Sequence, residues 1–301
     1  MTTKTIDPKE LSQRECYQIL SAAVAPRPIC FASTIDKAGK VNLSPYSFFN
    51  VFSSNPPVMV FSPNRSGRNN TTKNTHDNIL EVPEVTINIV NHAIVEQMSL
   101  ASTAYAKGVD EFVKSGLTPV ASNKVKPPRV GEAPVAFECK VNQVIELGDG
   151  PGAGNLVIAE VVKIHIQEKY LDEAGKLPTE GLDLVARMGG SYYCRAIPEA
   201  LFEIPKPLRE KGIGVDQLPE SVRNSAVLTG NNLGRLGNLK ALPSPTDITA
   251  IAQHKEVQKL ATIPSERERQ QGAHQLAQVW LEQGEVEAAL SLLIWVEGSQ
   301  G

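Results

Sequence analysis

The first two hundred residues alternate between short runs of apolar or β-branched residues and polar turns, a pattern typical of a β-rich domain. The clearest run is Val-Thr-Ile-Asn-Ile-Val at 85–90, with an asparagine in mid-strand. Helical spacing is predicted at 9–24, 72–80 and 93–104. Strands are predicted at 29–35, 40–43, 57–61, 85–90, 134–147 and 156–166. Many strands with few long helices favour an antiparallel barrel over a parallel sheet.

Two polar stretches are predicted to be turns. Asp36-Lys37-Ala38-Gly39 is a good hairpin turn between two strands. The glycine-rich run 148–155 could suggest a nucleotide site, but a dinucleotide fingerprint needs a helix after its glycines. Here a β-rich run, 156–166, follows instead. We therefore predict that 148–155 is a hairpin loop.

The pattern changes after Pro205-Lys206-Pro207, which we take as the end of a first domain, 1–205. Residues 206–250 are rich in Gly, Asn and Leu without a clear period, and are predicted to lie as an irregular segment on the core. Residues 251–301 are predicted to form a helical hairpin, broken at Gly284. This pair carries more apolar side chains than two short helices can hide. We expect it to pack on the barrel or on a second subunit; recruitment of another protein is the alternative.

Composition excludes several classes of protein. The 301 residues carry a net charge of −3, which argues against a general nucleic-acid binder. The four cysteines are scattered and form no C-x-x-C pair, so a zinc or dithiol site is not indicated. Neither a signal peptide nor a membrane-spanning stretch is readable, so a cytoplasmic protein without membrane contact is expected. No metal-ligand spacing and no nucleophilic triad is present.

A polar, basic loop follows the predicted strand 57–61. It contains Asn64, Arg65, Arg68, Lys73 and Thr75. Arginine and lysine beside small hydroxyls can hold a phosphate through charge-assisted hydrogen bonds. The alternative is a solvated polar loop without a ligand.

Residues 42–49, Asn-Leu-Ser-Pro-Tyr-Ser-Phe-Phe, combine small hydroxyls, a proline and aromatics in a predicted turn. Hydroxyls and backbone N–H groups there could bond the edge of a flat aromatic ligand. Alternatively, the hydroxyls satisfy the turn's own backbone.

Five motifs in order resemble the flavin reductase-like family, which is an FMN-binding split β-barrel, and its flavoredoxin-like subset. They are Ala25-Pro26-Arg27-Pro28-Ile29, residues 42–47, Lys73-Asn74-Thr75, residues 160–166 and Arg187-Met188-Gly189-Gly190-Ser191-Tyr192-Tyr193. The resemblance covers roughly 15–200 and implies a mainly β (α+β) fold with a C-terminal helical extension. It also implies FMN as cofactor and a homodimer.

The resemblance implies a set of cofactor-binding residues. Each of four residues also has an interpretation without a ligand. Asn88 could be a polar residue that is hydrogen-bonded within the protein, and Ser99 and Ser102 could point their hydroxyls outward. Arg187 could belong to a structural corner. The full candidate set is Ser33, Thr34, Asn42, Ser44, Pro45, Tyr46, Ser47, Phe48, Ser62, Asn64, Arg65, Arg68, Lys73, Thr75, Asn88, Ser99, Ser102 and Arg187. No residue is assigned as a catalytic acid, base or nucleophile.

The implied reaction is hydride transfer from NADH or NADPH to FMN, an NAD(P)H:FMN oxidoreductase activity. The protein would position the nicotinamide over the flavin, and the cofactor would perform the chemistry. Reduced flavin would then pass to a partner oxygenase or another electron acceptor. Two alternatives remain open: an electron-transfer flavoprotein, and a flavin-free binding or scaffold protein.

Overall fold

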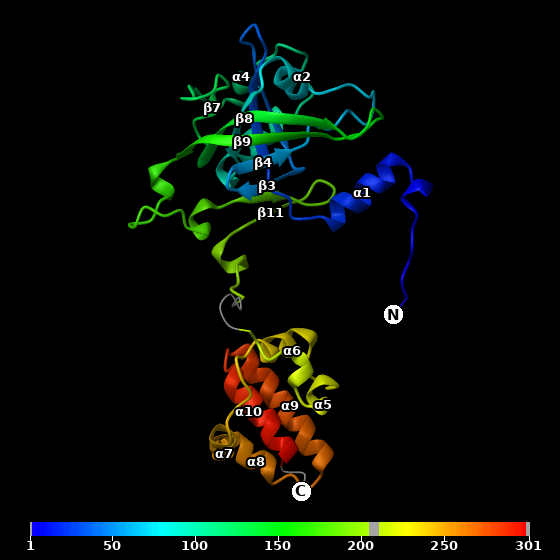
Figure 1. The fold of residues 1–301 in the computed structure, drawn as a ribbon, viewed down its shortest axis with the longest axis vertical. Helices are drawn as coiled ribbons and strands as arrows, with labels where there is room; N and C mark the ends of the chain where they lie inside the picture. Colours follow the sequence, from blue (N-terminus) through cyan, green and yellow to red (C-terminus); the bar gives the residue numbers. More distant parts are fainter. Residues whose placement is uncertain (1, 205–210, 299–301) are drawn as a thin grey trace. The chain divides into compact units, whose positions relative to one another are not determined.

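A computed structural model describes residues 2–204 and 211–298 of the chain (Figure 1). The chain divides into two compact units, 1–202 and 203–301. The predicted boundary at 205 lies outside the described residues. Each unit has its own hydrophobic core, and each is described by itself below.

Unit 1 is built on one seven-stranded antiparallel sheet with the order β2-β1-β5-β8-β9-β4-β3. The two longest strands, β8 and β9, form a hairpin and lie side by side (Figure 1). The strands are β1 Cys30–Ile35, β2 Val41–Tyr46, β3 Phe49–Ser54, β4 Pro57–Phe61, β5 Glu84–Ile89, β8 Val135–Glu146 and β9 Asn155–Ile166.

The connection between β2 and β3 shows that the sheet is curled. These are its two edge strands, yet only Ser47 and Phe48 separate them in sequence. A flat sheet of seven strands would place its edges about 29 Å apart, because strands lie about 4.8 Å apart. Two linking residues reach about 11 Å at most. The edges must therefore approach each other, as in a barrel, and the N–H of Ser62 fastens the bend by donating to the carbonyl of Phe48 at 2.9 Å.

Apolar side chains fill both faces of the curled sheet. One cluster includes Ala32, Phe61 and Val157, and the other includes Phe31 and Leu43. Because side chains alternate along a strand, β1 contributes to both clusters, and all six of its residues are buried. This double burial explains why apolar residues stand next to each other in β1, as Cys30, Phe31 and Ala32 do, instead of alternating with polar ones.

Short helices and two small sheets complete unit 1. The α-helices are α1 Gln13–Ala23, α2 Asn74–Glu81, α3 Val95–Ala101 and α4 Glu111–Ser115. The small sheets pair β6 Pro119–Val120 with β7 Arg129–Val130, and β10 Val185–Arg187 with β11 Tyr193–Arg195. The 3-10 turns of both units are η1 Pro8–Glu10, η2 His92–Ile94, η3 Glu168–Tyr170, η4 Thr179–Leu182, η5 Pro198–Ala200 and η6 Val215–Gln217.

The loop and turn predictions had different outcomes. Residues 148–154 do form the loop of the β8–β9 hairpin, with Gly152 at φ 81°, so that prediction is confirmed. The prediction of a turn over 42–49 is wrong, because β2 runs on to Tyr46 and β3 begins at Phe49. Pro45 is tolerated within β2 because that strand lies at the sheet edge.

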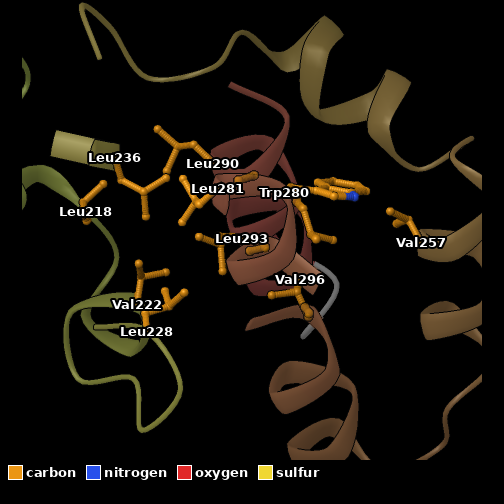
Figure 2. Packing of buried hydrophobic residues seen from close by; sticks show 14 residues of the cluster. Leu218, Val222, Leu228, Leu236, Val257, Trp280, Leu281, Leu290, Leu293 and Val296 are labelled. Carbon is orange, nitrogen blue, oxygen red and sulfur yellow. The ribbon is translucent and has the colours of Figure 1, made fainter. Parts of the chain in front are cut away.

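Unit 2 consists of short helices gathered around α9 and α10. The helices are α5 Glu220–Arg223, α6 Gly230–Gly237, α7 Pro245–Ile251, α8 Lys255–Ala261, α9 Glu266–Glu282 and α10 Val286–Gly298. Figure 2 shows Leu218, Val222 and Leu236 facing Leu281 and Leu290 in this core. The predicted helix break at Gly284 is confirmed, and this glycine has φ 88°.

The expectation for 206–250 differs from the structure. Where it is described, this segment contains α5, α6 and α7, and its apolar side chains share one core with α9 and α10. Leu290, Leu292 and Leu293 are fully buried by this packing. The apolar surface that was expected to need the barrel or a second subunit is thus covered by residues 213–261 of the same unit.

Candidate functional site

A buried arginine, Arg27, holds the bend that Ser47 and Phe48 form between β2 and β3. Arg27 is 6% exposed, and its Nη1 donates to the carbonyls of Ser21 and, at 2.7 Å, Val24. Its Nη2 donates to the carbonyl of Met188 at 3.0 Å, and its Nε lies 3.4 Å from the hydroxyl of Ser47. The guanidinium therefore ties the bend to α1 and to the corner before β11.

Helix α1 runs from the basic loop to this bend. The side chain of Gln13, at its first turn, lies against Gly67 and Gly152. Four residues later, Tyr17 meets Phe48 edge-on, with ring centres 6.3 Å apart. The end of the helix touches the bend through Ser21 and Arg27. In Figure 1, α1 accordingly lies between the tip of the β8–β9 hairpin and the loop that precedes β11.

Helix α1 therefore contacts both parts of the site, the basic loop through Gln13 and the bend through Tyr17. The start of the same loop meets the bend directly, because the N–H of Ser62 donates to the carbonyl of Phe48.

A hydroxyl at the start of α2 connects that helix to β2. Thr75 is fully buried, and its Oγ1 lies 2.8 Å from Asn42 Nδ2 and 2.8 Å from Tyr46 Oη. Burial raises the pKa of Tyr46 to about 12, so its phenol stays protonated at neutral pH. The three predicted residues Asn42, Tyr46 and Thr75 thus form one connected polar group.

Strand alternation separates the other predicted residues into two sets. Thr34 pairs with Asn42, and both side chains point to the face that carries α2, where Asn78 donates to Thr34 at 3.2 Å. Ser33 pairs with Leu43 and points to the opposite face. A single flat ligand on one face of the sheet cannot contact both Ser33 and Thr34.

The cations of the basic loop are of two kinds: the side chain of Arg65 is hydrogen-bonded within the loop, whereas those of Arg68 and Lys73 have no such bond in the described part of the chain. Arg65 donates through Nε and Nη2 to the side chain and carbonyl of Asn70, at 2.8 and 2.7 Å, so it shapes the loop. Among the described residues, the side chains of Arg68 and Lys73 form no ion pair or hydrogen bond. Lys73 immediately precedes α2, whose N-terminus has no side-chain cap. Helix N-termini with free N–H groups favour anions.

Two buried oxygen atoms beside this loop have no protein partner in the part of the chain that is described. Ser62 Oγ accepts from the N–H of Asn155 at 2.9 Å, and Asn64 donates to the carbonyl of Gly152 at 3.2 Å. The Oδ1 atoms of Asn64 and Asn155 remain unpaired. Buried acceptors without donors require a ligand or water, and ribityl hydroxyls are donors of the right kind. These two acceptors therefore fit the ribityl hydroxyls of a flavin nucleotide.

Three of the predicted residues, Asn88, Ser102 and Arg187, make contacts within the protein. Asn88 is fully buried, donates to the carbonyl of Phe31 and accepts from the N–H of Val130, so it holds the sheet and its loop together. Ser99 and Ser102 are exposed, and the hydroxyl of Ser102 is used within α3. Arg187 stacks on its neighbour Tyr193, with its guanidinium carbon 4.7 Å from the ring centre.

Sequence reasoning did not assign Arg27 to the site. The only signal was its place within the motif at 25–29, since nothing in the sequence alone shows that its guanidinium is buried under the bend.

Comparison with known proteins identifies the family. The model of the "Flavin reductase like domain" matches residues 22–181, entirely within unit 1. The chain belongs to this family. An uncharacterized protein of Aquifex aeolicus is 35% identical over 196 residues, which are 65% of this chain and 97% of that protein.

Solved structures support the same fold. Nitrilotriacetate monooxygenase component B from Bacillus cereus is 29% identical, with a TM-score of 0.63 over 68% of this chain and all of that chain. Flavoredoxin of Desulfovibrio vulgaris (Miyazaki F) shares the fold at 22% identity and a TM-score of 0.53, covering 69% and 98% of the two chains. Unit 1 is therefore a flavin reductase-like split barrel, as the sequence predicted.

Two further observations concern both units. Within 2–204 and 211–298, no helix is both long and apolar enough to cross a membrane. The same residues contain no group of three or more His, Cys, Asp or Glu side chains arranged to hold a metal ion.

Proposed function

We propose that unit 1 binds FMN, with the phosphate at the start of α2. The observation that carries this proposal is the uncapped N-terminus of α2, with Lys73 directly before it and Arg68 on the same loop. Both cations are without a partner among the described residues, and free N–H groups add to their field. Asn64 and Asn155 supply acceptors for the ribityl hydroxyls.

We place the flavin ring along the bend at Ser47 and Phe48. Helix α1 supports this position, because it contacts the loop through Gln13 and the bend through Tyr17. Phe48 is 36% exposed and offers an aromatic surface, and Ser47 offers a hydroxyl for the polar edge of the ring. The Thr75 group connects the start of α2 to Tyr46, the residue that precedes the bend.

The proposed reaction is hydride transfer from NADH or NADPH to FMN. The flavin supplies the hydride-accepting chemistry when bound, and the protein residues bind and orient the reactants. No side chain of the site needs to act as acid or base. The reduced flavin would serve a partner oxygenase or another acceptor, and the Bacillus cereus neighbour, a monooxygenase component by name, supports such a role.

Affinity for FMN compared with riboflavin tests the phosphate site. One charge-assisted contact is worth about 1.5 kcal/mol or more, which is about tenfold in affinity. We expect FMN to bind at least tenfold more tightly than riboflavin. Lys73→Ala should reduce this preference, whereas Lys37→Ala, at the exposed turn between β1 and β2, should not change it. Equal affinity of the wild-type protein for both flavins would refute the phosphate assignment.

An NADH and NADPH oxidation assay with added FMN tests the reaction itself. Turnover that depends on FMN is the expected result. Tight FMN binding without such turnover would favour the electron-transfer flavoprotein instead, and absence of flavin binding would favour the scaffold.

A further inference from the structure

Arg27 is a buried cation without an acidic partner. Its side chain is 6% exposed, and it forms no ion pair with any carboxylate in residues 2–204 or 211–298. Buried charges are normally paired, because an uncompensated charge in a poorly solvated place is costly. Another source of negative potential must therefore stabilise the buried charge of Arg27.

Part of that potential comes from α1. Ser21 and Val24, whose carbonyls accept from Nη1, lie at the C-terminal end of this helix. A helix C-terminus carries the equivalent of about half a negative charge. This contact offsets only part of the guanidinium charge, and the other acceptors are neutral: the carbonyl of Met188 and the hydroxyl of Ser47.

One donor of Arg27, its Nε, faces the bend and is not used by a carbonyl of the described residues. A guanidinium has five N–H donors. Three are used by carbonyls, while Nε is a long 3.4 Å from Ser47 Oγ. A serine hydroxyl that accepts from an arginine keeps its own hydrogen free to donate elsewhere. The ring of Phe48 lies 5.9 Å from the guanidinium carbon, so the charge is adjacent to the bend itself.

We propose that Arg27 is a positioning residue that orients the Ser47 hydroxyl as a donor toward the flavin and stabilises the negative charge that the ring gains on reduction. This inference rests on the proposed function, because it requires the flavin ring to lie at the bend. Positive charge near the polar edge of a flavin favours its reduced form over its oxidised form. A purely structural Arg27 would change both affinities equally.

The test compares the affinity of the protein for reduced and oxidised FMN. Arg27→Met keeps an unbranched side chain that reaches to about the position of Nε and removes the charge. It should lower the preference for reduced over oxidised FMN by about tenfold, which corresponds to a midpoint potential about 30 mV more negative for a two-electron couple. Arg27→Lys keeps the charge and should restore most of the preference. Midpoint potentials measured with reference dyes give the readout.

A second variant tests the route through the hydroxyl. Ser47→Ala should lower the potential by itself, and Arg27→Met should have a smaller effect in the Ser47→Ala background than in the wild-type protein. If Arg27→Met does not fold, as judged by thermal unfolding of the flavin-free protein, Arg27→Lys and Ser47→Ala carry the test.

The possible outcomes separate this inference from the proposed function. A wild-type protein that binds no FMN overturns the proposed function. A wild-type protein that binds FMN, together with Arg27→Met and Ser47→Ala variants of unchanged potential, overturns the role of Arg27 alone. Parallel losses of affinity for oxidised and reduced FMN would mean that Arg27 only supports the fold.

Discussion

The buried carboxylate of Glu138 in β8 allows a quantitative test of how the barrel holds the loop that precedes β7. It is fully buried and accepts from the N–H groups of Asn123 at 2.7 Å, Lys124, and Val125 at 3.2 Å. Nε2 of His165 lies 2.5 Å from its Oε1. Burial by itself raises the pKa of Glu138. The hydrogen bonds from Asn123, His165 and Lys124 outweigh burial, so that the pKa is lowered.

Glu138→Gln replaces one acceptor oxygen by an NH2 donor. At least two of the present donors then lose their acceptor. Each hydrogen bond to a charged group contributes about 1.5–3 kcal/mol, so the free energy of unfolding should fall by about 3 kcal/mol or more. For a unit of this size, that corresponds to a fall in melting temperature of about 6–12 °C.

The sequence provides a convenient assay for this change. All six tyrosines lie in unit 1, at positions from Tyr17 to Tyr193, and both tryptophans, Trp280 and Trp295, lie in unit 2. The tyrosine signal in the near-ultraviolet circular dichroism therefore follows unit 1, and tryptophan fluorescence follows unit 2. Glu138→Gln should shift only the tyrosine transition. The exposed Glu168→Gln is the matched control and should shift neither.

The pH dependence follows from the lowered pKa. A carboxyl group whose pKa is lower in the folded state contributes stability above its unfolded pKa, about 4.3, and loses it as the pH falls through the folded value. The difference between wild-type Glu138 and Glu138→Gln should thus shrink below about pH 4. Equal tyrosine midpoints of the two proteins at pH 7 would show that the reasoning is wrong.

Two further predictions concern the surfaces of the units. A chain that ends at residue 204 should keep its tyrosine unfolding midpoint and its FMN affinity, because unit 1 has closed cores of its own; aggregation of this chain would contradict the expectation. We also propose a homodimer through α1 and the edge strand β3, where Tyr17, Leu20, Val51 and Phe52 are exposed. Phe52→Glu should then give a monomer in analytical ultracentrifugation, and a wild-type protein that is already monomeric would exclude this dimer.

Local patterns predicted the parts of the fold that depend on neighbouring residues. The β8–β9 hairpin was readable because its strands are long and its loop is rich in glycine. The break between α9 and α10 was readable because Gly284 separates two helical patterns, and its φ of 88° suits glycine. In both cases the sequence carries the signal within a few residues.

The closure of the barrel could not be read in the same way. It depends on β2 and β3 becoming the two edges of one sheet, which is set by strand pairing far along the chain. The same non-local packing buries Arg27 under the bend, from a motif that carries no burial signal of its own. The separation of Ser33 from Thr34, by contrast, follows from strand alternation, and could have been drawn from the predicted strand at 29–35.

In unit 2, the sequence showed that apolar residues needed cover but did not show which residues would cover them. The apolar residues of α9 and α10 did require cover, as their pattern indicated. The cover consists of short helices, of four to eight residues in α5, α6, α7 and α8, which complete too few turns to show a hydrophobic period.

The packing of unit 2 bears on what the second unit can contribute to flavin chemistry. Its described residues leave few large apolar side chains exposed, namely Ile204, Val215, Leu242 and Val279. The family match ends at residue 181, and the cations, orphaned amide oxygens and bend of the candidate site all belong to unit 1. A core that is closed within unit 2 needs no surface of the barrel to be stable. We therefore expect FMN binding to depend on unit 1 alone.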